Sequence, residues 1–239
     1  MVYDRTVNGQ VLDFGNTSAL YESDMVMVDH QTGSYWVQVT GQAVVGELTG
    51  QQMGLLPAQT TTWELWKVQH PDTLVLSRDT GFSRDYNRDN FANIGEIFNE
   101  TGQFFFPVSE NGRDSRLQPG EVVVGVEVGN AQRGYPIERL GDGVINDHIG
   151  DHPIVIFSSA KGPTGAAYSS VLDDKTLTFI WDGQAFIDTE TNSSWSLSGQ
   201  ATTGSLTGAQ LEPLPMRSTF WFSLAASFPG IELYELDEN

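Results

Sequence analysis

The sequence predicts a mainly β fold: two pseudo-repeats of antiparallel strands, each closed by a short helix, in a barrel-like or sandwich-like arrangement. One observation behind this is that a long segment of the chain recurs at a fixed spacing. Another is that strand-length runs of β-branched residues alternate with tight-turn signals. The third is that each copy ends in a short run of helical spacing before a proline. We expect the two copies to pack face to face around a pseudo-two-fold axis.

The repeat is clearest in residues 41–71, which correspond to residues 199–229. The two segments are identical at 13 of 31 positions, whereas chance gives about two. We therefore interpret the pattern as an internal duplication. Farther upstream a spaced pattern of aspartate, threonine, serine and tryptophan also recurs: Asp29, Thr32, Ser34 and Trp36 correspond to Asp188, Thr191, Ser193 and Trp195.

This repeat divides the chain into three parts. Residues 1–77 form the first repeat, which is N-terminally incomplete because the strand-rich segment 122–157 has no counterpart before it. Residues 78–120 form a polar connecting excursion whose aromatic run, 104–106, we expect in the core, and residues 121–239 form the second repeat. Strands left open where the first repeat lacks that segment favour a homodimer through an exposed sheet edge, or a groove.

Turn and strand signals justify the elements in order. Asn8-Gly9 and Asp173-Asp174 separate alternating runs and predict tight hairpins. Residues 61–69 and 219–227 predict the two helices, each opening with a threonine that can cap it. The strand-length runs rich in β-branched residues are 25–28, 35–39, 122–128 and 154–157.

Composition excludes several classes of function. The chain has 31 acidic and 12 basic residues, a net charge of −19, so it repels phosphate and no nucleic-acid partner is expected. It has no cysteine, which excludes disulfides and thiolate metal sites in this chain. No apolar run is long enough to predict a membrane span, and no signal peptide opens the chain.

Several motifs together resemble one family. They are residues 20–29, Gln31-Thr32, Trp36, Thr40-Gly41, residues 70–81 and Gly125-Val-Glu-Val128. The chain resembles the bacterial and archaeal domain-of-unknown-function family 3179 over nearly its whole length. The resemblance implies a prokaryotic or metagenomic protein with an extracytoplasmic location and no established reaction.

The same resemblance implies a Cys-Pro-x-Cys-Gly segment, sometimes with selenocysteine, just before the position of Val2. Such a pair of residues would suggest redox or soft-metal chemistry. That segment is absent from this chain. The equivalent place in the second repeat, residues 157–165, also has no thiol.

Residues 85–96 predict a calcium-binding loop outside a true EF-hand. Oxygen-bearing side chains occupy its first, third, fifth, ninth and twelfth positions, and the seventh offers a backbone carbonyl. These residues are Asp85, Asn87, Asp89, Phe91, Asn93 and Glu96. Asn90 stands where an EF-hand has glycine, and a solvated Asn/Asp-rich loop is the alternative interpretation. Calcium is the one cofactor that the sequence predicts.

Two further pairs of residues are candidate sites. His148 and His152 are four residues apart, which suits a metal on a helix, but Gly150 and Pro153 favour a solvated hairpin turn instead. Trp66 and Trp181 are aromatic residues without a counterpart in the other repeat, so they are candidates for lining a ligand groove. Core packing is the alternative for both tryptophans.

No catalytic residue is assigned. Asp79-Thr80-Gly81 matches the turn of aspartic proteases, but that chemistry needs two such turns, and the corresponding Asp237 is followed by Glu238. The nucleophile elbow Gly-x-Ser-x-Gly is also missing. We therefore predict an extracytoplasmic β-rich binding or structural module with an unknown ligand, stabilised by calcium. The alternative is an enzyme, either a remnant of a thiol or selenol redox protein or a hydrolase with an unfamiliar site.

Overall fold

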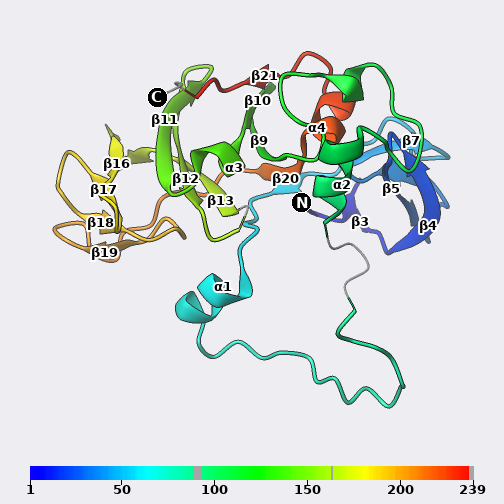
Figure 1. The fold of residues 1–239 in the computed structure, drawn as a ribbon, viewed down its shortest axis with the longest axis horizontal. Helices are drawn as coiled ribbons and strands as arrows, with labels where there is room; N and C mark the ends of the chain where they lie inside the picture. Colours follow the sequence, from blue (N-terminus) through cyan, green and yellow to red (C-terminus); the bar gives the residue numbers. More distant parts are fainter. Residues whose placement is uncertain (89–92, 163, 237–239) are drawn as a thin grey trace.

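Short, mostly antiparallel sheets make up most of the molecule, so the mainly β prediction is confirmed. The computed structural model describes residues 1–88, 93–162 and 164–236. Two small sheets lie at opposite ends of the long axis, with larger strands between them (Figure 1). The small sheets of the two repeats therefore do not pack face to face as expected, because strands of residues 121–239 lie between them. Among the described strands no sheet closes into a barrel, and the arrangement is sandwich-like.

The first repeat forms the small sheet drawn in blue in Figure 1. Its strands are β4 (Phe14–Tyr21), β5 (Asp24–Asp29), β6 (Tyr35–Val37) and β7 (Gln42–Val45), paired in that order. The hairpin of β2 (Thr6–Val7) and β3 (Gln10–Val11) and the pair of β1 (Val2–Tyr3) and β8 (Leu55–Leu56) flank it. Asn8 and Gly9 both have positive φ, as the predicted tight hairpin requires. Trp36 and Leu12 are the largest fully buried residues of its core.

The second repeat forms the matching sheet at the other end. Its strands are β16 (Phe179–Trp181), β17 (Phe186–Asp188), β18 (Ser194–Trp195) and β19 (Ala201–Thr203), again paired in sequence order. The hairpin of β14 (Val171–Leu172) and β15 (Lys175–Thr176) turns at Asp173 and Asp174, which both have positive φ. Trp195 is buried at the centre of its core.

The same polar cluster holds a tight turn in both small sheets. The indole N–H of Trp36 donates to Asp29 over 2.9 Å, and that of Trp195 donates to Asp188 over the same distance. The threonine and serine hydroxyls between each pair lie 2.7 Å apart in both sheets. Burial raises the pKa of Asp29, but hydrogen bonds from the indole and the turn outweigh it, so the net pKa is lowered. Each buried carboxylate is thus fully partnered by its own turn.

Two central sheets, both formed by residues 121–239, lie between the two small sheets and pack face to face on an aliphatic core. One contains β20 (Met216–Phe220), β9 (Val122–Val128), β10 (Ala131–Tyr135) and β21 (Glu232–Leu233), paired in that order. The other contains β11 (Gly143–Ile149), β12 (His152–Ser159) and β13 (Thr164–Ser169), and the short helix α3 (Ile137–Leu140) connects the two sheets. Most side chains of β12 and β13 are buried, which suits their apolar sequence.

Helices occur at both predicted positions. They are α1 (Trp63–Gln69) and α4 (Trp221–Ser227). The cap of α1 is Thr62, whose hydroxyl accepts from the Leu65 backbone N–H, and the residue before α4 is Phe220, which makes no side-chain cap. The predicted capping residue of α1, Thr61, is therefore one residue too early. The predicted cap of α4 at Thr219 does not form. Thr219 instead pairs with Val123 in the central sheet.

The connecting excursion contains α2 (Ile94–Thr101) and the one-turn helix η1 (Asn111–Arg113). Phe104 packs between Phe98 and Phe222, as expected for a core residue. Phe105 and Phe106 remain 62% and 52% exposed, so the prediction for the aromatic run is wrong for these two. Phe105 contacts the Phe98 ring edge-on, with ring centroids 5.5 Å apart, which leaves most of Phe105 in solvent.

Candidate functional site

A cavity of about 370 Å³ lies where α1 meets the second repeat. Trp181, at the end of β16, lines it and packs on Phe186, with ring centroids 4.9 Å apart. Trp195 and Leu197 extend this apolar wall from the core of the second repeat. The polar lining comes from α1, from the end of β12 and from loops: Gln69, Asp142, Ser158, Ser159, Lys161, Gln184 and Ser196.

The polar side of the cavity carries two charged side chains, Asp142 and Lys161, and each has its own partners. The carboxylate of Asp142 is held in place because it accepts from the Ser159 hydroxyl over 3.0 Å and from the Ala160 backbone N–H over 2.9 Å. The Lys161 ammonium lies 3.5 Å from Glu64 of α1 in an exposed ion pair, a kind that contributes little to stability. An aromatic wall facing polar groups that already have partners suits an uncharged ligand.

One family model, described as a protein of unknown function (DUF3179), matches residues 1–230. The chain belongs to the DUF3179 family. No curated protein and no solved structure matches it. Within the described ranges, no helix of this DUF3179 protein is both long and apolar enough to cross a bilayer.

The two candidate tryptophans of this DUF3179 chain have different surroundings. Trp181 lines the cavity, whereas Trp66 lies on α1 outside the cavity lining. The Trp66 indole N–H donates to the Thr73 hydroxyl over 2.9 Å, and its ring packs at a tilt against His70, with ring centroids 4.0 Å apart. The structure therefore brings one of the two tryptophans to a ligand-sized space.

The candidate histidines lie at the end of the β11–β12 hairpin, as the hairpin interpretation predicted. His148 is opposite Pro153 and His152 is opposite Ile149 in the antiparallel register. Residues opposite each other share a face, so the two histidines project from opposite faces of the hairpin. Their imidazoles do not converge on a shared ligand.

The candidate calcium residues are only partly described, because Asp89 and Phe91 lie outside the described residues. The Asp85 carboxylate accepts from the Asn87 backbone N–H over 3.1 Å, and the Asn87 amide oxygen accepts from Arg78 over 2.5 Å.

The other two candidates belong to helix α2. Asn93 precedes α2 with φ of 62°, and Glu96 is in its first turn. In the described part of the chain, no three His, Asp or Glu side chains are already gathered around one point as metal ligands.

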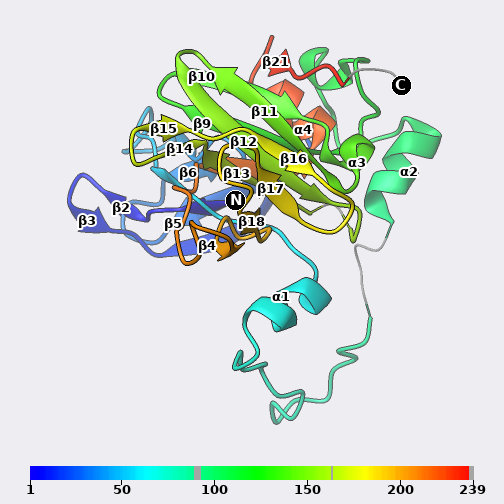
Figure 2. The same ribbon diagram turned by 90° about the vertical axis from the view of Figure 1, so that its left-hand side faces the viewer.

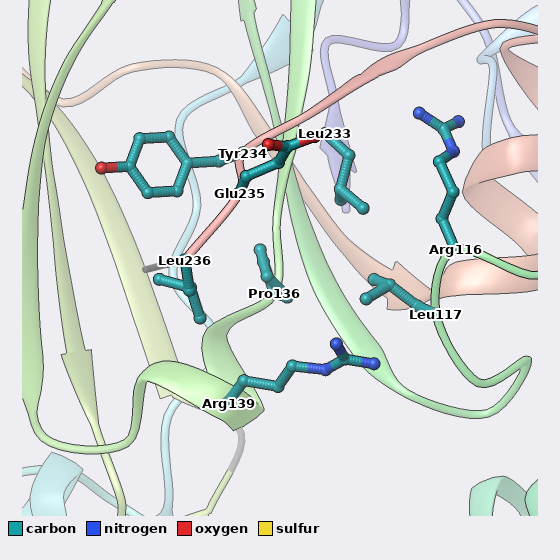
Figure 3. Close-up of a pocket in the computed structure, with 8 residues that line it drawn as sticks. All are labelled: Arg116, Leu117, Pro136, Arg139, Leu233, Tyr234, Glu235 and Leu236. Atoms are coloured by element: carbon teal, nitrogen blue, oxygen red, sulfur yellow. The ribbon is translucent and has the colours of Figure 1, made fainter. Parts of the chain in front are cut away.

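Sequence reasoning missed a larger cavity, of about 620 Å³, beneath the segment that follows β21 (Figure 3). Arg116 and Arg139 line it. Arg139 donates to both oxygens of Glu121 over 2.7 and 2.9 Å, and Arg116 makes a similar contact with Asp114. Both guanidiniums are already neutralised, so this space is a weaker candidate for an anion.

Sequence reasoning also missed a buried polar junction between the first repeat and the central sheet. Arg217 of β20 is 3% exposed and donates to the Val39 carbonyl over 2.8 Å and to Glu127 over 2.8 Å. The Tyr3 hydroxyl donates to the same carbonyl over 2.7 Å, and burial raises the pKa of Tyr3 to about 12. Burial also raises the pKa of Asp24, which accepts from the Val39 N–H, to about 6. No spacing or motif in the sequence brings these positions together.

Proposed function

We propose that this protein is an extracytoplasmic ligand-binding module and that the cavity beside Trp181 holds a small uncharged ligand. The observation that carries the proposal is an aromatic wall opposite a polar rim whose charged side chains already have partners. The volume falls in the usual range for small-molecule sites. The acidic, lysine-poor composition supports an extracytoplasmic setting.

The chemistry of the lining favours a neutral hydroxylated ring, such as a monosaccharide or disaccharide. The flat face of such a ring would lie against the Trp181 indole, where it loses contact with water. Its hydroxyls would exchange hydrogen bonds with the amides of Gln69 and Gln184 and with the carboxylate of Asp142. An anionic ligand would have to separate Lys161 from Glu64, and the Asp142 carboxylate would repel it.

Binding is tested by titrating a panel of neutral monosaccharides and disaccharides and measuring heat by calorimetry. We expect at least one sugar to bind and Trp181→Ala to weaken it by about tenfold or more, since hot-spot aromatic residues cost at least that much. Trp66→Ala is the matched control, because Trp66 lies outside the cavity. Equal loss in both variants, or no sugar that binds, would contradict the proposal.

Calcium stabilisation is the second part of the proposed function. The supporting observations are the spacing of oxygen side chains in residues 85–96 and the net charge of −19, which attracts divalent cations. In this proposal the hydrogen bond from Arg78 to the Asn87 amide oxygen breaks, so that the oxygen can bind the ion. Its measurable consequence is a higher melting temperature in calcium than in chelator.

A further inference from the structure

One part of the molecule presents apolar side chains to solvent over a long stretch. We call residues 63–88, from α1 through the extended segment after it, the arm. The extended segment projects away from the body in both ribbon views (Figure 1, Figure 2). Leu74, Val75 and Leu76 are 95%, 69% and 89% exposed. Trp63, Trp66, Val68 and Phe82 are exposed as well. Contiguous apolar exposure of this kind marks an interaction surface.

The second repeat shows what covers the equivalent segment. With the spacing that relates residues 41–71 to 199–229, Leu74–Leu76 corresponds to Glu232–Tyr234. There, β21 (Glu232–Leu233) pairs in parallel with β10, and Gly134 accepts from the backbone N–H of Tyr234 over 2.9 Å. The arm therefore corresponds to a helix followed by an edge strand. Among the described residues its strand, Leu74–Leu76, has no strand beside it of the kind that β10 provides for β21.

No backbone hydrogen bond joins Leu74, Val75 or Leu76 to another described residue. A Leu-Val-Leu run suits a β-strand. An extended, apolar and unpaired backbone is a template for pairing with a second strand. Two such segments can pair, because the backbone N–H and C=O groups of each supply the hydrogen-bond partners that the other lacks.

Charge indicates what the neighbour is. The whole chain carries −19, so two copies repel each other over most of their surfaces. The arm holds equal numbers of acidic and basic residues. The acidic ones are Glu64, Asp72, Asp79 and Asp85, and the basic ones are Lys67, Arg78, Arg84 and Arg88. Two copies can therefore approach through their arms without like-charge repulsion.

We infer that the partner of the arm is a second copy of this chain. The Leu74–Leu76 segments of two copies pair antiparallel about a two-fold axis near Val75. The exposed apolar residues of each α1, Trp63 and Val68, are covered in the same interface. An interface that uses the same patch on both copies closes on itself and gives a dimer rather than a fibre.

The absence of cysteine allows a direct test by cross-linking. In an antiparallel pair centred on residue 75, the two copies of Val75→Cys lie directly opposite, within reach of a disulfide after mild oxidation. We expect Val75→Cys to form a covalent dimer rapidly. Val45→Cys is the matched control, because Val45 is 57% exposed on the edge strand β7 of the first repeat. Equal or faster cross-linking of Val45→Cys would overturn the assignment to the arm.

Sedimentation velocity measures the association without a cross-link. We expect a dimer that Val75→Lys weakens by about tenfold or more, since a charge on a strand edge opposes pairing. Circular dichroism should not change, and neither should the melting of the monomer below the dimer dissociation constant, because Val75 makes no core contact. A wild-type chain that stays monomeric at about 100 µM overturns the proposal. Wild-type monomer that binds phosphatidylcholine/phosphatidylglycerol vesicles through Val75 overturns it too and assigns the arm to a membrane surface.

Discussion

Helices α1 and α4 occupy corresponding positions in the two repeats, yet they differ completely in burial. Each spans seven residues and begins with tryptophan. Trp221 of α4 is 0% exposed and packs with Val123 and Ile231, whereas Trp63 of α1 is 48% exposed. No residue of α1 is buried. The comparison shows that local sequence sets where a helix forms, while burial depends on whether another element supplies a surface.

The two helices are also stabilised by different means. Helix α1 has a side-chain cap from Thr62, an acidic Glu64 in its first turn and a basic Lys67 in its last turn, which oppose the helix dipole. Helix α4 has none of these features. Its stability comes from packing on the central sheet and from the Trp221 indole, which donates to the Asp114 carbonyl over 2.9 Å. Most helical stability in proteins is of this second kind.

The largest expected effect comes from truncating the two matched tryptophans. Trp221→Ala should lower the free energy of unfolding by about 3–5 kcal/mol, because it leaves a cavity in the core and an unpaired carbonyl. Trp63→Ala should change it by less than about 0.5 kcal/mol, as for other exposed positions. Urea unfolding followed by circular dichroism measures both.

These measurements are made at a protein concentration below the dimer dissociation constant, so that association adds nothing to stability. Similar costs at the two positions would break the comparison, since they would mean that α1 packs as α4 does. A cost for Trp63→Ala that appears only at high concentration would locate its partner in a second copy.

Elements encoded by local sequence could be predicted. The hairpins at Asn8-Gly9 and Asp173-Asp174 and both helix positions follow from turn chemistry and spacing. The strand pair around His148 and His152 was predictable because Gly150 and Pro153 exclude a helix.

Features that depend on distant contacts could not be predicted. Trp181 and Trp66 have the same status in the sequence, and only the packing of α1 against the second repeat separates them. In the sequence nothing distinguishes Arg217 from the other basic residues. In the structure β20 places it against Val39, which is far away in the chain. The cap at Thr219 failed because pairing with Val123 fixed that residue in a strand. Long-range contacts override local propensity at each of these positions.

A smaller effect on the free energy of unfolding comes from Asp24, a carboxylate that the first repeat has and the second lacks. The β4–β5 hairpin is longer than β16–β17, and Asp24 lies on the extension. Burial raises the pKa of Asp24 from 3.8 to about 6. Between these pH values the folded state holds a proton that the unfolded chain has released, so stability falls as pH rises, and the full penalty is present above pH 6.

Asp24→Asn removes this penalty. We expect the variant to be more stable than wild type by about 1–2 kcal/mol at pH 7.5 and equal to it at pH 3.5. Asp182→Asn, on the β16–β17 turn, is the control, because hydrogen bonds from the backbone N–H groups of Ala185 and Gln184 lower the pKa of Asp182 and the variant should gain nothing at pH 7.5. A pH-independent difference between Asp24→Asn and wild type would show that titration is not the cause.

The smallest expected effect is the gain in stability on adding calcium. This measurement tests whether an ion, rather than packing, holds the end of the arm near Asp85. The loop begins with Asp85 in the arm and ends with Glu96 in α2. Calcium at about ten times its dissociation constant should add about 1 kcal/mol, which raises the melting temperature by about 2–4 °C. Asp85→Ala with Glu96→Ala should abolish the rise. Asp72→Ala with Glu100→Ala removes the same charge nearby and should retain it. If both double variants lose the rise equally, calcium acts by general screening of the −19 charge, and the end of the arm has no ion of its own.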